Sequence, residues 1–395
     1  MPSTLYNKIL RISLIMLPAV LLFLLLDQWH YLFETFNRGQ VFGRDAYNLW
    51  SAGRILLEEG SARNIYNNDA FTDFQIKSAG EGIGWNSYFY PPTAFLTAAL
   101  VGLVPYSIAL PLYSLAGLSA FILAVSAPHY KRSVILILLI APMTSFNIIM
   151  GQNGLISAAL LIGGLRLLPY RPSLAGILFG LLAFKPILGL LIPPLLLIRK
   201  DWSAFISASL TVMVSALLPV LLWGSEVWVL FFSQAMEIQK NTLHHAVGIG
   251  MHMIPSAFNS ARILGADTLT SYIAQALLST TAFIIFIIYF IKNRRLSRQS
   301  LSAQDILIFT LATTMISPYI HNYDFSMIEG AILIYCISLK DKITTPALSF
   351  LIAACWCTGF ISLFGNIAYI PFAPLVLIIA LYIASRRAPI HTPIS

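Results

Sequence analysis

Two charged residues in largely apolar surroundings are the strongest candidates for chemistry in this sequence. After Asp45, apolar residues recur every three or four positions as far as Glu58-Glu59-Gly60, so Asp45 would stand at the start of an amphipathic helix. Lys185, followed by Pro186, interrupts a long apolar stretch. A charge at mid-membrane depth costs about 2.5–3.5 kcal/mol on insertion scales, which marks such a lysine as functional. A carboxylate can act as a general base, and an ammonium group can bind a phosphate.

Both residues also have a structural interpretation. Aspartate is a preferred N-cap residue, so Asp45 could cap its helix, with or without a catalytic role. Lys185 could form an ion pair with Asp324 or Glu329, which lie near the start of a later apolar segment. The sequence alone leaves these alternatives open.

Further polar candidates lie in short connections between apolar segments. Gly151-Gln152-Asn153-Gly154 joins two of them and is either an ordinary tight turn or a turn that binds hydroxyl groups. The connection 317–324 places His321, Tyr323 and Asp324 together. Tyr90-Pro91-Pro92 opens another short apolar segment, where the prolines favour a helix start. These connections would bring polar side chains to one side of a membrane.

The remaining motifs exclude several function classes. His244, His245 and His252 form a possible cluster, but an adjacent pair with a third histidine seven residues on is weak evidence for a metal site. We expect neither a metal nor any other cofactor. The sequence contains no phosphate-cradling glycine loop, dinucleotide fingerprint or nucleophile elbow. The predicted cytoplasmic loops are only turns, which could hardly bind ATP or a nucleotide sugar. An activated sugar donor should therefore be carried by a lipid and reached from the outer leaflet.

The elements that must position these residues are membrane helices. Hydrophobic residues make up 58% of the chain and charged residues 10%, against about a quarter charged in soluble proteins. Most of the 24 lysines and arginines flank the same ends of the apolar segments. This bias predicts both termini in the cytoplasm, with the hydrophilic segments 27–106 and 224–266 and the active site outside. The net charge of +8 is thus a topology signal, and no nucleic-acid partner is expected.

We predict one all-α integral membrane domain over 1–395, with about twelve transmembrane helices plus interfacial and partial helices on the outer side. The partial helix, 93–104, is too short to span a bilayer, which takes about 20 residues. The stretch 173–198 is broken at Lys185-Pro186, and such breaks are tolerated only where protein or water satisfies the backbone. An outward-opening cavity is therefore expected there. The other predicted helices are 9–26, 107–127, 133–149, 152–168, 203–223, 268–291, 304–318, 325–339, 344–364 and 366–385.

In order along the chain, these motifs resemble glycosyltransferase family 87, mannosyltransferase-like enzymes of the GT-C superfamily. The resemblance rests on Asp45-x-Tyr47-x-x-Trp50-x-Ala52-Gly53, Gly60, Ile65-Tyr66, Tyr90-Pro91-Pro92, Gly151-Gln152-Asn153, Phe184-Lys185-Pro186, Pro255–Phe258 through Arg262–Gly265, and Ser317-Pro318-Tyr319 through Tyr323-Asp324. It implies a GT-C fold and inverting transfer of a sugar, usually mannose. The donor would be a polyprenyl-phosphate sugar, and the acceptor a hydroxyl of a glycolipid or glycan.

The resemblance also implies roles for single residues. Asp45 matches the catalytic carboxylate, and one base suffices because a phosphate departs without a general acid. A hydrolase would need two carboxylates. We expect Lys185, Arg262 and Arg44 to bind the donor phosphate. Donor and acceptor would also be bound by His321, Tyr323, Asp324, Gln152, Asn153 and Tyr90.

Two other classes remain open from the sequence. A transporter or flippase of lipid-linked glycans would need polar residues throughout the membrane depth, whereas here they gather at one face. A polysaccharide polymerase or ligase would carry its large outer loop later in the chain. The segment 224–266 is rich in histidine and poor in acidic residues, which leaves the acceptor undefined.

Overall fold

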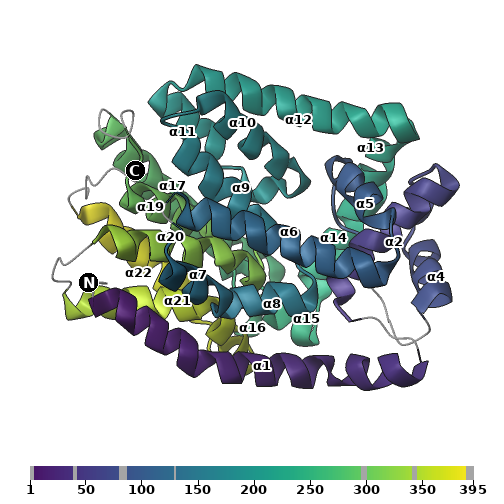
Figure 1. Cartoon of the computed structure of the whole chain (residues 1–395), viewed down its shortest axis with the longest axis horizontal. Coiled ribbons are helices and arrows are strands. Elements are labelled where there is room, and N and C mark those ends of the chain that lie inside the picture. The colour runs from purple at the N-terminus through teal and green to yellow at the C-terminus, as the bar shows by residue number, and fades with distance from the viewer. Residues whose placement is uncertain are drawn as a thin grey trace.

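The computed structural model describes residues 4–38, 42–79, 87–128, 130–294, 300–339 and 345–387, with only the backbone for Thr4 and 27–38. Every regular element in these ranges is a helix, which confirms the all-α polytopic fold (Figure 1). Five helices are long and apolar enough to cross a bilayer. They are α1 (Thr4–Arg38), α6 (Tyr106–Ser126), α12 (Trp202–Trp223), α17 (Thr268–Lys292) and α21 (Pro346–Ile367).

Shorter apolar helices complete the bundle. Helices α9 and α19 have 14 residues each, about 21 Å, which is less than the roughly 30 Å of a hydrocarbon core. The number of complete crossings therefore stays a prediction. The shorter helices are α7 (Arg132–Leu139), α8 (Pro142–Met150), α9 (Gly154–Leu167), α10 (Pro172–Leu181), α11 (Ile192–Arg199), α19 (Ala303–Ile316), α20 (Ser326–Ser338) and α22 (Ala373–Arg386).

Three predicted helices differ from the observed ones, and the last of them, 366–385, starts only at Ala373 because α21 extends to Ile367. The first does not end at residue 26, because α1 continues to Arg38. The segment 133–149 is two helices, α7 and α8, bent by 56°. Pro142 stands at the start of α8, where its missing N–H and fixed φ suit a helix start and cannot continue α7. The predicted break at Lys185-Pro186 is confirmed, since short 3₁₀ turns η3 (Leu182–Phe184) and η4 (Pro186–Leu188) flank Lys185.

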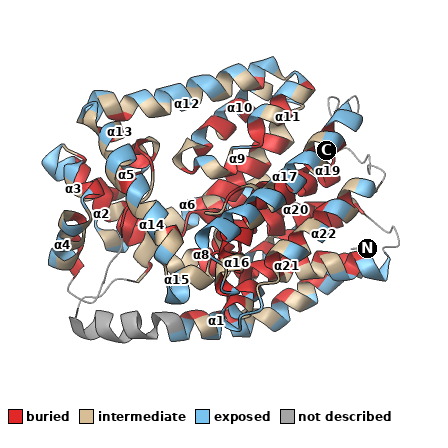
Figure 2. Ribbon diagram, turned by 180° about the vertical axis from the view of Figure 1, so that it is seen from behind, coloured by how far each residue is buried: buried red, intermediate tan, exposed pale blue. Residues whose placement is uncertain are grey.

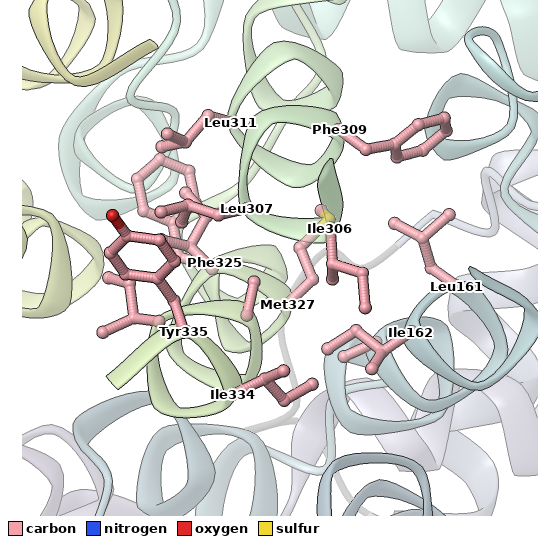
Figure 3. Close-up of a cluster of buried hydrophobic side chains, with 14 of the residues drawn as sticks. Leu161, Ile162, Ile306, Leu307, Phe309, Leu311, Phe325, Met327, Ile334 and Tyr335 are labelled. Carbon is pink, nitrogen blue, oxygen red and sulfur yellow. The ribbon is translucent and has the colours of Figure 1, made fainter. Parts of the chain in front are cut away.

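The centre of the bundle is built from helices that are buried on all sides. Helix α19 is buried from Ala303 to Met315, as Figure 2 shows for this region, because α9, α17, α20 and α22 pack around it. Figure 3 shows its Ile306 and Phe309 among Leu161 and Ile162 of α9 and residues of α20. The polar connections that contain the candidate site residues join the helices of this packed core.

The two predicted outer loops are themselves helical and share a second apolar core. The first contains α2 (Arg44–Glu59), α3 (Arg63–Tyr66), α4 (Asn68–Ala79), the 3₁₀ turn η2 (Pro92–Ala94) and α5 (Phe95–Gly102). The second contains α13 (Glu226–Leu230), the π-helix η5 (Phe231–Ala235), α14 (Met236–His245), α15 (Gly248–His252) and α16 (Ala257–Ile263). The predicted amphipathic and partial helices correspond to α2 and α5. Residues 39–41 and 80–86 of the first loop lie outside the described residues. We call α2–α5, η5 and α13 the outer module, because their apolar side chains pack in one cluster.

Glycines set the close contact between α2 and α5. A Cβ on Gly53 would lie 1.9 Å from the Ala98 carbonyl oxygen, and one on Gly102 would lie 2.7 Å from the Gly53 carbonyl carbon. Small residues allow two helix backbones to approach in this way. Trp50 of α2 donates its indole N–H to the Val104 carbonyl at 2.9 Å. The helix that carries Asp45 is therefore fixed on the outer module.

Candidate active site

A cavity of about 390 Å³ is lined by both the bundle and the outer module. Its walls come from α1, α2, α8, the Lys185 break, α14, α15 and the connection before η6 (Asn322–Phe325). The predicted side chains that line it are Arg44, Asp45, Tyr90, Gln152, Lys185, His321 and Tyr323. Segments far apart in the sequence thus meet at one polar site, at the predicted cavity.

Asp45 is the second residue of α2 and is half-buried. The N-cap is Gly43, in the left-handed region with φ 73°, so the alternative that Asp45 caps this helix is wrong. The Tyr106 hydroxyl donates to the carbonyl oxygens of Phe42 and Gly43 at 2.5 and 2.7 Å. Burial raises the pKa of Tyr90 well above its usual value, and the negative charge of Asp45 adds to this rise. The start of α2 is thus fixed by Tyr106, with Asp45 in the cavity wall.

The turn Gly151–Gly154 contacts both the start of α2, which carries Asp45, and the His321–Asp324 segment. Gly151 has φ 69°, and a Cβ there would lie 2.7 Å from the Ala46 Cβ and 2.9 Å from the Gly43 carbonyl oxygen. On the other side, a Cβ on Gly154 would lie 2.3 Å from the Tyr323 carbonyl oxygen. The turn is therefore inserted between the start of α2 and the His321–Asp324 segment, which brings Gln152 to the cavity wall.

Replacing Gly151 with alanine should lower any activity that depends on Asp45 at least tenfold. The added Cβ would meet the backbone of α2 beside Asp45, and displacement of a catalytic group by about 1 Å can cost 10²-fold in rate. Gly60→Ala is the matched control, because Gly60 has φ 63° but no heavy atom within 4 Å of the position that an added Cβ would take. Both variants carry the same backbone strain, so equal activities would refute the positioning role of Gly151.

Lys185, which lines the cavity, forms a buried ion pair with Asp324, which lies behind it. The Nζ–Oδ1 distance is 2.6 Å, and the side chains are 8% and 0% exposed. The ammonium also lies 4.4 Å from the centre of the Tyr323 ring. Of the two predicted partners, the structure selects Asp324. Glu329 instead accepts the backbone N–H of Met143 at 3.1 Å, at the start of α8.

Asp324 holds two residues of the cavity wall, Lys185 and His321. Its Oδ2 accepts the backbone N–H of His321 at 3.1 Å, while Oδ1 accepts from Lys185. Asp324 is not among the lining residues, so the prediction that it binds donor or acceptor directly is not supported by its position. Its two oxygens instead fix one cation and one turn of the backbone.

His321 lies in the connection between α19 and η6, outside the apolar helices. Its Nδ1 is 2.9 Å from the Tyr319 carbonyl oxygen, which only accepts, so Nδ1 carries the proton and Nε2 is an acceptor. Burial, with a smaller contribution from the positive charge of Lys185, lowers the pKa of His321 to about 4. At neutral pH the ring is therefore uncharged, stacked on Tyr323 at 5.1 Å between centroids.

A model of one known protein family matches residues 88–318, more than half of the 395 residues. The chain belongs to glycosyltransferase family 87. No curated protein and no solved structure matches it significantly. The matched range includes Tyr90, Gln152 and Lys185, whereas Asp45 and the His321–Asp324 segment lie outside it. Their place in the site of this glycosyltransferase rests on geometry.

Besides Asp324, two further predicted residues of the glycosyltransferase do not line this cavity. Asn153 lines an adjacent cavity and donates from Nδ2 to the Tyr90 hydroxyl. Arg262 donates to the carbonyl oxygens of Leu243 and Ala246 at 2.7 and 3.4 Å, where α14 ends. Unpaired carbonyls at a helix end attract such a side chain, so the position of Arg262 supports a structural role and not phosphate binding.

The second outer loop of the glycosyltransferase also contains the predicted histidine group. His244 Nε2 lies 2.8 Å from the Tyr272 hydroxyl. Within the described part of the chain, no three His, Cys, Asp or Glu side chains are arranged to hold a metal ion.

The cavity of the glycosyltransferase also contains polar residues that the sequence analysis missed. Asn48 lies one turn after Asp45 on the same face of α2 and donates to the Ser87 carbonyl at 2.9 Å. Its spacing of three residues from Asp45 was a usable signal. Gln239 of α14 also lines the cavity, but the π-helix before it changes the helical register, which the sequence does not reveal.

Proposed function

We propose that this family 87 glycosyltransferase moves a sugar, most simply mannose, from a polyprenyl-phosphate donor to a hydroxyl group of a glycolipid or glycan. One observation carries the proposal: a carboxylate, Asp45, and a buried ammonium, Lys185, line the same cavity. These are the two groups that displacement of a phosphate by a hydroxyl requires. No second function is favoured by a comparable observation.

In the proposed reaction, Asp45 accepts the proton of the acceptor hydroxyl as its oxygen attacks C1 of the sugar. The new oxygen–C1 bond forms on the face opposite the phosphate, so the configuration inverts. The bond from C1 to the phosphate oxygen breaks, and the electron pair leaves with the polyprenyl phosphate. A general base of this kind contributes about 10²–10⁴-fold to the rate.

Lys185 would stabilise the negative charge that develops on the phosphate. An ammonium group has three donors, and the structure assigns one of them to Asp324. The others are available to phosphate oxygens. Arg44, which also lines the cavity, would supply a second cation. Because Asp324 holds Lys185 before the substrate arrives, little reorganisation of this cation is needed during the reaction.

The neutral side chains of the cavity suit the hydroxyl groups of sugars. Gln152 offers both a donor and an acceptor, and neutral His321 offers an acceptor at Nε2. We infer that these side chains, with Tyr90 and Tyr323, orient the transferred sugar or the acceptor.

We also infer that the reaction occurs on the extracytoplasmic side of the cell membrane. The basic residues predict cytoplasmic termini. The start of α1 and helix α22 lie at the end of the molecule opposite α2, α4 and α5 (Figure 1). The outer module and the cavity beneath it would then face away from the cytoplasm.

A transfer assay tests the proposal. Membranes that contain the protein are incubated with labelled polyprenyl-phosphate-mannose and total lipid and glycan extracts, beside membranes that lack it. We expect label in a new product only when the protein is present. If no sugar were transferred from polyprenyl-phosphate-mannose or from other polyprenyl-phosphate sugars, the proposal of a lipid-linked donor would be refuted.

A further inference from the structure

Asn147 lies where helix α8 meets the active site, although it does not line the cavity. Its side chain is 1% exposed. It stands four residues before Gly151, the first residue of the turn that contacts the start of α2. Because a buried polar side chain needs hydrogen-bond partners, the contacts of this amide show what it holds in place.

Both N–H groups of the Asn147 amide donate hydrogen bonds. Nδ2 donates to the Met143 carbonyl at 2.7 Å, one turn earlier in α8, and to the Tyr323 carbonyl at 3.0 Å. Carbonyl oxygens only accept hydrogen bonds, so these two partners fix the orientation of the amide. The side chain of Asn147 therefore links the helix before the turn to Tyr323, a residue of the cavity wall.

The backbone of Asn147 holds a second residue of the cavity wall. Its carbonyl oxygen accepts the backbone N–H of Gln152 at 2.8 Å. One residue thus binds Gln152 through its main chain and Tyr323 through its side chain. Ser326 forms a parallel link, because its hydroxyl donates to the Gly154 carbonyl at 2.9 Å and lies 3.2 Å from the Tyr323 carbonyl oxygen.

Each side of the active site is also fixed by contacts of its own. Lys185 is paired with Asp324 at 2.6 Å. The Tyr106 hydroxyl holds the backbone just before Asp45. These contacts hold the cation and the base separately, so the separation between them depends on residues that bridge the two sides.

We propose that Asn147 is a positioning residue that sets the separation between the general base and the cation of the active site. On one side, Gly151 meets the start of α2, and on the other the Tyr323 ring lies 4.4 Å from the Lys185 ammonium. The side chain of Asn147 connects these two contacts. The inference rests on the proposed function, since a hydroxyl that attacks opposite the phosphate requires the base and the cation at a fixed spacing.

Asn147→Leu removes both amide donors at nearly the same side-chain size. The Tyr323 carbonyl keeps its contact with the Ser326 hydroxyl, and the main chain at position 147 can still accept from Gln152. The variant also removes Oδ1, which is buried without a hydrogen-bond partner in the part of the chain that the structure describes. Such an atom is unfavourable in a protein interior, so we expect Asn147→Leu to fold.

Thr144→Val is the matched control. Thr144 lies on the same helix, is 0% exposed and lines neither the active-site cavity nor the adjacent one. Among the described residues its hydroxyl has no hydrogen-bond partner, so the substitution removes a buried polar group without breaking a link. Two quantities are measured for each variant. One is the rate of sugar transfer in a single turnover, and the other is the equilibrium binding of labelled polyprenyl-phosphate-mannose without acceptor.

We expect Asn147→Leu to transfer sugar at least tenfold more slowly, because displacement of a catalytic group by about 1 Å can cost 10²-fold in rate. Its Kd for the donor and its number of binding sites per protein should stay close to those of the wild type, since Asp324 still holds Lys185. Thr144→Val should match the wild type in rate and in binding.

Three results would overturn the inference. They are an unchanged rate in Asn147→Leu, an equal slowing in Thr144→Val, and a loss of donor-binding sites in proportion to the loss of rate. The last result would show that Asn147 only maintains the fold. If the wild type neither bound nor used the donor, the proposed function itself would fail, which separates the two failures. Ser326→Ala, which breaks the parallel link, repeats the test if Asn147→Leu does not fold.

Discussion

Replacing Asp45 with asparagine is expected to reduce sugar transfer by about 10²–10⁴-fold, the usual contribution of a general base. Asparagine keeps the size and a hydrogen-bond acceptor but cannot take the proton of the attacking hydroxyl. Asp45 does not cap α2, so its charge is not required as a cap. Expression and thermal stability should therefore remain close to those of the wild type. The measurement is the initial rate at saturating concentrations of donor and acceptor.

Asp69→Asn is the control for this variant. Asp69 lies in the first turn of α4, in the same outer module, but is exposed and lines neither the active-site cavity nor the adjacent cavity that Asn153 lines. It should retain full activity. If Asp45→Asn were as active as Asp69→Asn, Asp45 could not be the base, and the assignment of the active site would be wrong.

The helices could be predicted from the sequence because membrane helices depend on simple local features. Long apolar runs ending at charged residues located α6, α12 and α17 within about one residue. The break at Lys185 was equally visible, since a charge before a proline interrupts an apolar run. The bend between α7 and α8 and the extension of α1 were not predicted, because hydropathy reports burial and not the direction of a helix.

The site could be predicted only in part, because the sequence shows the type of each residue but not its tertiary contacts. Asp45 and Lys185 were identified because a charge beside apolar segments needs an explanation. Arg262 is a cation like Lys185, but it donates to a carbonyl at the end of α14. That contact depends on where α14 ends in space. Gly151 could be recognised as a turn residue, but its contact with Ala46 depends on tertiary packing. Residue type therefore predicted candidates, and packing separated residues that line the cavity from residues with structural contacts.

The largest combined effect on stability and activity is expected at the ion pair of Lys185 and Asp324. Removing one partner of a buried pair leaves the other charge uncompensated and costs about 3–5 kcal/mol. Lys185→Met and Asp324→Asn should each lower the melting temperature in detergent. Lys185→Met should also reduce transfer by about 10²–10³-fold, because it removes a donor to the phosphate. Its apparent KM should rise more for the lipid donor than for the acceptor.

The double variant Lys185→Met/Asp324→Asn separates structure from catalysis. With both charges gone, no buried charge is left unpaired, so the double variant should be more stable than either single variant. It should nevertheless remain as inactive as Lys185→Met, because the ammonium that faces the phosphate is still absent. Asp324→Asn alone should retain more activity, since it keeps that ammonium. Recovery of transfer together with stability in the double variant would show that Lys185 only holds the fold.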